Sequence, residues 1–194
     1  MEKLIFATNN EHKLSEVKQM LEGLYQVIGL EEAGIFEDIP ENEPTLEGNA
    51  RFKARFIHEK FNMNVFADDT GLEIEALNGE PGVFSARYAG EAKNSNDNMK
   101  KVLFNLSNST NRSAQFRTVL CLILNNHEFL FEGIVKGEIL EKPIGHTGFG
   151  YDPIFKPEGH SLSFAEMGMK EKNEISHRGR AIQNFVQHLK SKTK

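Results

Sequence analysis

The stretch VFADDTGLEIEAL, residues 65–77, decides our interpretation of the fold. Its first three residues are an apolar run typical of a short buried strand, and two acids, Asp68 and Asp69, follow directly. From Leu72 to Leu77 apolar and acidic residues alternate, which indicates a half-exposed strand. We therefore expect a strand that ends at Asp68-Asp69-Thr70-Gly71, followed by a second strand.

The segments on either side alternate between strand and helix patterns. Strands are expected at residues 3–7 and 25–30, and a long hairpin at 114–124 and 128–139. Helical spacing of apolar residues predicts helices after Asn10, at 45–61, at 96–106 and at 175–189. The pattern is that of an α/β protein. A chain of 194 residues with 39% hydrophobic residues fits one domain, 1–194, or two closely packed lobes.

Composition excludes several classes of protein. The longest apolar candidate, residues 118–124, is far shorter than the roughly 20 residues of a membrane helix. The N-terminus reads as a strand and not as a signal peptide, so we expect a cytoplasmic protein without membrane contact. Cys121 is the single cysteine, which excludes an internal disulfide. The net charge of -5 argues against nucleic-acid polymers as partners.

A first polar constellation follows the first strand. Thr8-Asn9-Asn10 leads into a helix whose free N–H groups and dipole attract an anion, and Lys13 lies one turn further on. This is a plausible phosphate site, although it lacks the glycines of a P-loop. The alternative is an ordinary helix cap followed by a solvated lysine.

The two aspartates form a second constellation. Side chains alternate along a strand, so one acid can face a metal or water while the other faces a structural partner. Hard oxygen ligands suit Mg²⁺, with Glu41 or Glu43 as a further carboxylate and Lys53 as a phosphate contact. The alternative is an acidic turn that bonds its own backbone.

Two further groups lie near the C-terminus. Phe149-Gly150-Tyr151-Asp152 presents two rings on a turn between glycines, where they could stack on a planar base or simply anchor packing. In Ser176-His177-Arg178, two cations stand at a helix start, against the helix dipole, unless an anionic or carbonyl group lies nearby. Lys172, four residues before the cap, adds a donor; the alternative is a pair of surface cations.

Together, five motifs resemble the inosine triphosphate pyrophosphatase family in order and over nearly the whole chain. They are TNNEHK (8–13), ADDTGL (67–72), PGVFSARYAG (81–90), FGYDPIF (149–155) and EKNEISHRGRA (171–181). The resemblance implies Mg²⁺-dependent hydrolysis of ITP, dITP and XTP to the monophosphate and pyrophosphate. It also implies an elongated mixed central sheet with flanking helices, forming two lobes around a substrate cleft, and a homodimer.

The resemblance also implies a role for each matching residue. Asp69 would be general base and metal ligand, assisted by Asp68 and by Glu41 as second metal ligand, with Thr70 in contact with substrate. The triphosphate would be held by Thr8, Asn9, Asn10, Lys13 and Lys53. The base would lie between Phe149 and Tyr151, joined by Gly150, and its edge would be read by Asp152, Lys172, Ser176, His177 and Arg178.

Two rival functions use some of the same residues. Asp69-Thr70-Gly71 is also the DTG of aspartic proteases, but the chain has one DTG and strong helical periodicity, whereas that class is β-rich and pairs two such motifs. A nucleotide or RNA-binding module would use the aromatic and cationic residues, yet it has no need of the adjacent acids. Pyrophosphate release separates the three functions.

Overall fold

The computed structural model describes residues 2–192, which divide into two compact units. Unit 1 comprises Met1–Asp69, Thr118–Gly133 and Gly179–Lys194, and unit 2 comprises Thr70–Arg117 and Ile134–Arg178. Three strands, β3 (Val65–Ile74), β5 (Ser113–Leu124) and β6 (His127–Ile139), begin in one unit and end in the other. The division therefore falls within strands and not at a linker. That the two lobes are not independent domains stays a prediction.

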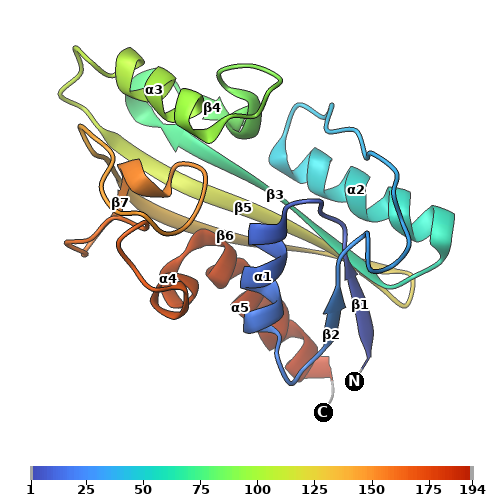
Figure 1. Cartoon of the computed structure of the whole chain (residues 1–194). Helices are drawn as coiled ribbons and strands as arrows, with labels where there is room; N and C mark the ends of the chain where they lie inside the picture. The colour runs from blue at the N-terminus through green and yellow to red at the C-terminus, as the bar shows by residue number, and fades with distance from the viewer. Residues whose placement is uncertain (1, 193–194) are drawn as a thin grey trace. The chain divides into compact units, whose positions relative to one another are not determined.

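The strands follow the order β2-β1-β3-β5-β6-β7, with β4 paired to β3. Strands β1 (Lys3–Phe6) and β2 (Gln26–Ile28) are parallel, as are β1 and β3, whereas β4 (Pro81–Gly82) and β7 (Phe155–Pro157) pair antiparallel with β3 and β6. The mixed α/β architecture predicted from the sequence is confirmed (Figure 1).

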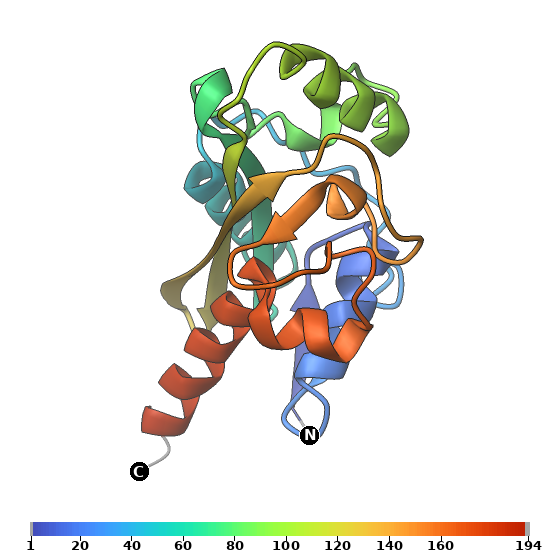
Figure 2. The same cartoon turned by 90° about the vertical axis from the view of Figure 1, so that its left-hand side faces the viewer.

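In unit 1, helices cover both faces of the strands. Helices α1 (Glu11–Met20) and α5 (His177–Lys192) lie on one side and α2 (Leu46–Phe61) on the other (Figures 1 and 2). Both faces need cover because side chains alternate along a strand. Phe6 and Phe66 stack with their ring centres 4.5 Å apart, in the cluster with α1 and α5. Their buried neighbours Ile5 and Val65 point to the opposite face. The cluster contains Leu4, Phe6, Leu14, Val17, Leu21, Val27, Phe66, Leu120, Leu122, Ala181, Ile182 and Phe185.

Unit 2 has its own hydrophobic core beneath α3 (Ser95–Asn105). Helix α3 lies beside β4 (Figure 1) and contributes Met99 and Val102 to this core. The short helix α4 (Met169–Ile175) also belongs to this unit. The other buried core residues are Leu72, Ile74, Tyr88, Leu106, Ala114, Phe116, Val135, Ile139, Tyr151, Ile154, Phe155, Phe164 and Met167.

Several predicted boundaries are confirmed and one is wrong. Helix α2 begins after the predicted Thr45 cap, and the hairpin turns at Asn125 and Asn126, which both adopt positive φ as a two-residue turn requires. The predicted break after the aspartates does not occur, because β3 continues through them to Ile74. The predicted C-terminal helix is confirmed as α5, which begins at His177 directly after Ser176, whereas α4, which ends at Ile175, has no counterpart among the predicted helices.

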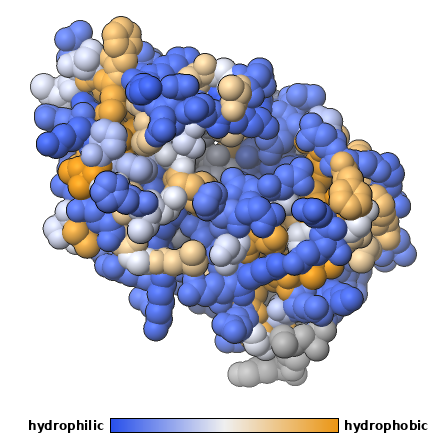
Figure 3. All heavy atoms as spheres, viewed as in Figure 1, coloured by the Kyte–Doolittle hydropathy of each residue, from blue (hydrophilic) through white to orange (hydrophobic). Residues whose placement is uncertain are grey.

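Three observations concern the surface and the single cysteine. The face in Figure 3 is predominantly hydrophilic, with hydrophobic residues in scattered groups. Within residues 2–192, no helix combines the length and apolar composition that a membrane span requires. Cys121 is fully buried in β5, and burial raises the pKa of its thiol to about 12, which leaves it protonated and unreactive.

Candidate active site

The first group of polar residues collects where two parallel strands of unit 1 lead toward the same edge. Ile5 and Phe6 of β1 pair with Val65 and Phe66 of β3, so the residues that lie two positions after the last pair are at the same level of the sheet. Those residues are Thr8 after β1 and Asp68 within β3. The carboxyl ends of parallel strands are a common location for ligand sites.

The turn after β1 is organised as the helix start that the sequence predicts. Asn10 caps α1 by accepting a hydrogen bond from the Lys13 N–H at 3.1 Å, and its own N–H donates to the Thr8 hydroxyl at 3.2 Å. Asn9, between them, is exposed. The turn is therefore a fixed helix N-terminus beside a cation, which favours an anion.

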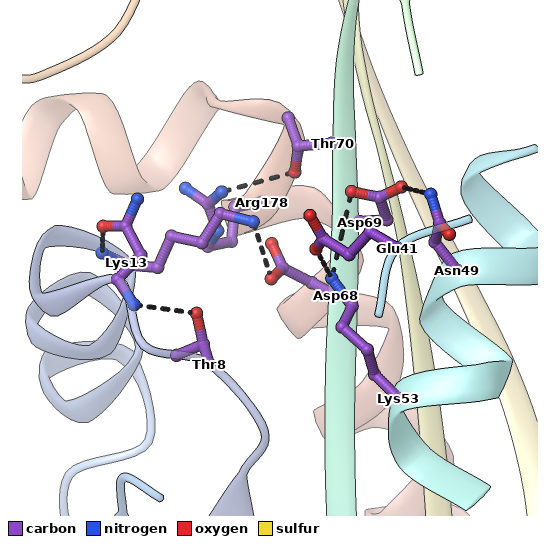
Figure 4. Close-up of polar contacts among 10 residues, drawn as sticks. Thr8, Lys13, Glu41, Asn49, Lys53, Asp68, Asp69, Thr70 and Arg178 are labelled. Atoms are coloured by element: carbon purple, nitrogen blue, oxygen red, sulfur yellow. Dashed lines mark hydrogen bonds and ion pairs between the residues drawn. The ribbon is translucent and has the colours of Figure 1, made fainter. Parts of the chain in front are cut away.

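Asp68 and Asp69 point to opposite faces of β3, because neighbouring side chains in a strand alternate. Asp68 faces α1 and accepts a hydrogen bond from Lys13 Nζ at 2.9 Å. Asp69 faces α2, where Asn49 Nδ2 donates to its Oδ2 at 2.9 Å and Lys53 Nζ lies 4.0 Å from its Oδ1 (Figure 4). Each acid thus contacts side chains of a different helix.

A third carboxylate, that of Glu41, lies near Asp69 because both acids contact Lys53. Lys53 Nζ lies 2.5 Å from Glu41 Oε1, so Glu41 and Asp69 face the same ammonium group. Burial lowers the pKa of Lys53, but the carboxylates Asp69, Glu41 and Asp68 outweigh burial and leave that pKa raised. Glu43 lies elsewhere: its side chain is exposed and packs closely against Gly48. Glu41 is therefore the better-placed second acid.

The pKa of Asp69 is raised above the ordinary value of an aspartate. Burial is the main cause, and the negative charge of Glu41 adds to it; the charges of Lys53 and Lys13 and the hydrogen bond from Asn49 oppose the shift without cancelling it. A buried carboxylate with a raised pKa beside cations is a frequent property of functional acids.

The donor set fits a divalent metal that is completed by substrate. In residues 2–192, no three His, Cys, Asp or Glu side chains are grouped closely enough to hold an ion by themselves. However, Mg²⁺ in enzymes that act on phosphates commonly takes one or two carboxylates and fills its other positions with water and phosphate oxygens. Asp69 and Glu41, which already share a cation, match this requirement.

The second group of polar residues belongs to unit 2. Lys172 of α4 donates to Asp152 Oδ2 at 2.8 Å, and the two side chains are only 5% and 4% exposed. The same oxygen accepts the Phe149 N–H at 2.8 Å, which fixes the turn on which the half-buried Phe149 stands. Lys172 Nζ lies 4.8 Å from the centre of the Phe149 ring. One acid thus fixes both the aromatic turn and the lysine.

Tyr151, on the same turn, is placed differently from Phe149. Its ring lies in the core of unit 2, its hydroxyl donates to the Ser85 carbonyl at 2.8 Å, and burial raises the pKa of that hydroxyl. This burial does not fit the stacking role that the sequence predicts for Tyr151. Between the two rings, Gly150 has φ +64, and a Cβ atom added there would meet nothing within 4 Å, so the turn is open at this point.

The cations at the start of α5 are buried and not solvated. Arg178 is 1% exposed, its guanidinium donates to the Thr70 hydroxyl at 3.3 Å, and it lies 5.8 Å from the Phe149 ring centre. His177 stacks on Phe116 at 4.6 Å, and Ser176 is buried beside it. The alternative of tolerated surface cations is therefore wrong. Thr70 directly follows Asp69 in β3, so Arg178 contacts the residue next to the acid.

Two residues with structural importance for the site are not evident from the sequence. Asn49 lies on the buried face of α2 with Ala50 and Lys53, and a polar residue within an apolar helical stripe is the available signal. Ser85 holds β3 through its hydroxyl, which accepts the Leu72 N–H at 2.9 Å, and its carbonyl accepts the Tyr151 hydroxyl. It lies in the motif PGVFSARYAG, whose residues have no role that the sequence alone predicts.

Comparison with known proteins places the chain in a family. The model of the Ham1 family matches residues 4–188. The chain belongs to the Ham1 family. It is 52% identical to a dITP/XTP pyrophosphatase of Flavobacterium psychrophilum, over 97% of this chain and 99% of the relative, and 55% identical to one of Porphyromonas gingivalis, over 94% of each. The solved Ham1 protein of Staphylococcus aureus superposes with a TM-score of 0.88 at 40% identity, over all of both chains.

The Ham1 match confirms the resemblance stated from the five motifs. Every residue predicted for the site, from Thr8 to Arg178, lies within the matched range. The Ham1 fold accounts for the mixed sheet as well, since the similarity to the solved structure extends over the complete chain. The roles of the individual residues are a separate question.

Proposed function

We propose that this chain hydrolyses the α–β phosphoanhydride of ITP, dITP and XTP, releasing the nucleoside monophosphate and pyrophosphate. The observation that carries the proposal is the placement of Asp68 and Asp69, which lie beside a capped helix start and are each held by a lysine. The names of relatives at 52–55% identity support the substrate class. The product is a nucleotide that a polymerase can no longer use.

The residues of unit 1 act on the triphosphate. The N-terminus of α1, with Thr8, Asn9 and Asn10, and the ammonium groups of Lys13 and Lys53 neutralise phosphate charge. Asp69 and Glu41 would hold Mg²⁺, which would offset the charge that develops on the phosphate oxygens. Asp69 orients and deprotonates the attacking water; the water oxygen bonds to the α-phosphorus, and the bond from that phosphorus to the bridging oxygen breaks. Asp68 keeps Lys13 in place.

The residues of unit 2 recognise the base. Phe149 stacks on it, and the donors Lys172, His177 and Arg178 face the O6 acceptor of hypoxanthine or xanthine. Adenine has an amino group at that position, so donors would meet a donor. Each buried donor left unpaired costs about 1–3 kcal/mol, enough for substantial discrimination. Asp152, Ser176, Gly150 and Thr70 maintain the geometry of these contacts.

Pyrophosphate release from a panel of triphosphates tests the proposal. With Mg²⁺, we expect turnover of ITP, dITP and XTP, turnover of ATP at least about tenfold lower in kcat/KM, and loss of activity when the metal is removed with EDTA and restored when it is returned. Release of orthophosphate in place of pyrophosphate, or no turnover of any triphosphate, would refute the proposed reaction. Equal turnover of ATP and ITP would refute the specificity alone.

Phe149 and Tyr151 are expected to differ when they are substituted. Phe149→Ala removes the stacking surface, which is worth about 1–3 kcal/mol per base, so KM for ITP should rise about tenfold or more. Tyr151→Phe removes only the bond to the Ser85 carbonyl, so it should lower stability by about 1 kcal/mol and leave KM within about twofold. Steady-state kinetics and thermal unfolding measure both effects. An equal rise in KM for the two variants would restore the stacking role of Tyr151.

We also propose the surroundings in which the enzyme works. A net charge of -5 suits a small-molecule substrate that is drawn in by a few local cations, and it disfavours nucleic-acid polymers. We place the protein in the cytoplasm, with the nucleotide pool, and without membrane partners. We propose a homodimer, as the family resemblance implies, which sedimentation velocity can test.

A further inference from the structure

We propose that Asn49 is a positioning residue that fixes the carboxylate of Asp69 for metal binding and links it to the segment that carries Glu41. The inference rests on the proposed function, since it concerns the same acids. Asn49 is only 1% exposed and belongs to the first turns of α2. Both ends of its side-chain amide form hydrogen bonds, one with β3 and the other with the acidic loop before α2.

The hydrogen-bond pattern determines which end of the amide meets Asp69. The Glu43 N–H donates to Asn49 Oδ1 at 3.0 Å, and a backbone N–H can only donate. The oxygen of the amide must therefore face Glu43, which leaves Nδ2 facing Asp69 Oδ2 at 2.9 Å. A buried donor on one carboxylate oxygen fixes the rotation of the carboxylate plane (Figure 4).

Asn49 and Lys53 divide the two oxygens of Asp69 between them. They lie four residues apart on α2, hence on the same face, with Asn49 on Oδ2 and Lys53 Nζ 4.0 Å from Oδ1. Asn49 carries no charge, so it orients the acid without adding a cation that would compete with a divalent metal. Because ligating carboxylates depend on such outer partners, their loss commonly lowers metal affinity about 10–100-fold.

The acidic loop is tied to the same amide. Glu43 is two residues after Glu41, and its N–H is held by Asn49. A Cβ atom at Gly48 would lie 2.8 Å from the Glu43 Cβ, so glycine at this position permits the close approach of the loop to α2. One buried side chain thus contacts the carboxylate of Asp69 directly and holds the loop of Glu41 through the backbone of Glu43, two residues further on.

Two variants and a matched control test the inference. Asn49→Leu keeps the shape of the side chain and removes both hydrogen bonds, and Asn49→Ser is too short to make them and serves if the leucine variant does not fold. Asn98→Leu is the control: Asn98 is 3% exposed, accepts the Ala89 N–H at 2.7 Å and donates to the Ala86 carbonyl at 2.9 Å, far in sequence from the acids. It removes an equivalent buried amide.

The test is Mn²⁺ binding to the nucleotide-free full chain, measured by electron paramagnetic resonance, together with kcat and KM for ITP at saturating Mg²⁺. For both Asn49 variants we expect a Kd for Mn²⁺ at least about tenfold higher, a kcat about tenfold lower or more, and KM within about twofold. Asn98→Leu should lower Tm and leave the Kd for Mn²⁺ within about twofold.

The result that would overturn the inference is an Asn49 variant with the wild-type Kd for Mn²⁺, or a control that weakens Mn²⁺ as much as the Asn49 variants do. The proposed function fails separately. If the wild type hydrolyses no triphosphate but loses Mn²⁺ affinity on substitution of Asn49, the positioning role stands and the reaction does not. If it hydrolyses ITP and the Asn49 variants bind Mn²⁺ normally, the reaction stands alone.

Discussion

Asp69→Asn is expected to lower kcat for pyrophosphate release from ITP by about 10²–10⁴-fold, the range that loss of a positioned general base produces. The amide keeps the size of the side chain and can still accept the bond from Asn49, so the change is one of charge and basicity. A continuous pyrophosphate assay with saturating Mg²⁺ and ITP measures it, and circular dichroism verifies the fold.

Asp68→Asn is the matched control for that variant. It removes a charge one residue away on the opposite face of β3, where the partner is Lys13 and not the proposed metal ligands. We expect a clearly smaller loss of kcat than in Asp69→Asn. If both variants lost activity equally, the division of roles between the two acids would be wrong; if Asp69→Asn stayed within tenfold of the wild type, the base would have to be another group.

Asp69→Asn should also be more stable than the wild type in metal-free buffer. Because burial raises the pKa of folded Asp69 above its ordinary value of 3.8, the folded protein holds this proton more tightly than the unfolded chain. Stability is therefore greatest below that value and falls as pH rises through the raised pKa. Asp69→Asn escapes this loss, so its Tm should exceed that of the wild type at pH 8, by about 2–4 °C per kcal/mol, and equal it near pH 3.5.

Lys172→Met should be among the most destabilising substitutions in unit 2. It leaves Asp152 buried without its cation, and breaking a buried ion pair from one side costs about 3–5 kcal/mol. Asp152→Asn/Lys172→Met should recover most of this loss, since neither partner then carries a charge. Lys156→Met is the surface control, because the Lys156 pair with Glu138 is partly exposed and worth about 1 kcal/mol or less.

The double variant also tests the contribution of the Lys172–Asp152 pair to substrate choice. With stability restored, loss of the ammonium donor should lower the ratio of kcat/KM for ITP to that for ATP by about 10–100-fold. Competing-substrate assays measure the ratio directly. A double variant with the wild-type ratio would assign base discrimination to His177 or Arg178 instead.

Features with a local cause could be predicted from the sequence. Helix α2 follows from a threonine cap and a regular apolar stripe, and the hairpin from two long strand patterns joined at Asn125 and Asn126. The acids and lysines of the site could be named because a site for a metal ion and phosphate groups requires charged side chains. Their pairing could not, since it depends on β1 and β3 being parallel and in register.

Features that depend on tertiary packing could not be predicted from the sequence. Phe149 and Tyr151 look equivalent as neighbours of a glycine, and only the packing of unit 2 separates a half-buried ring from a core ring bonded to Ser85. Asn49 resembles any polar residue of a helix until Asp69 is placed against it. Helix α4 has only seven residues, which is too short for apolar spacing to predict it.

Because Asp68 and Asp69 lie within an unbroken strand, the site cannot tolerate a change in chain length between Val65 and Ile74. One inserted or deleted residue ahead of the pair would exchange the faces of the two acids, turning the proposed base toward Lys13 and its neighbour toward Lys53. Insertions are more readily accommodated at the turn before Val65 or beyond Ile74. Within this strand, we expect substitutions to be accommodated more readily than insertions or deletions.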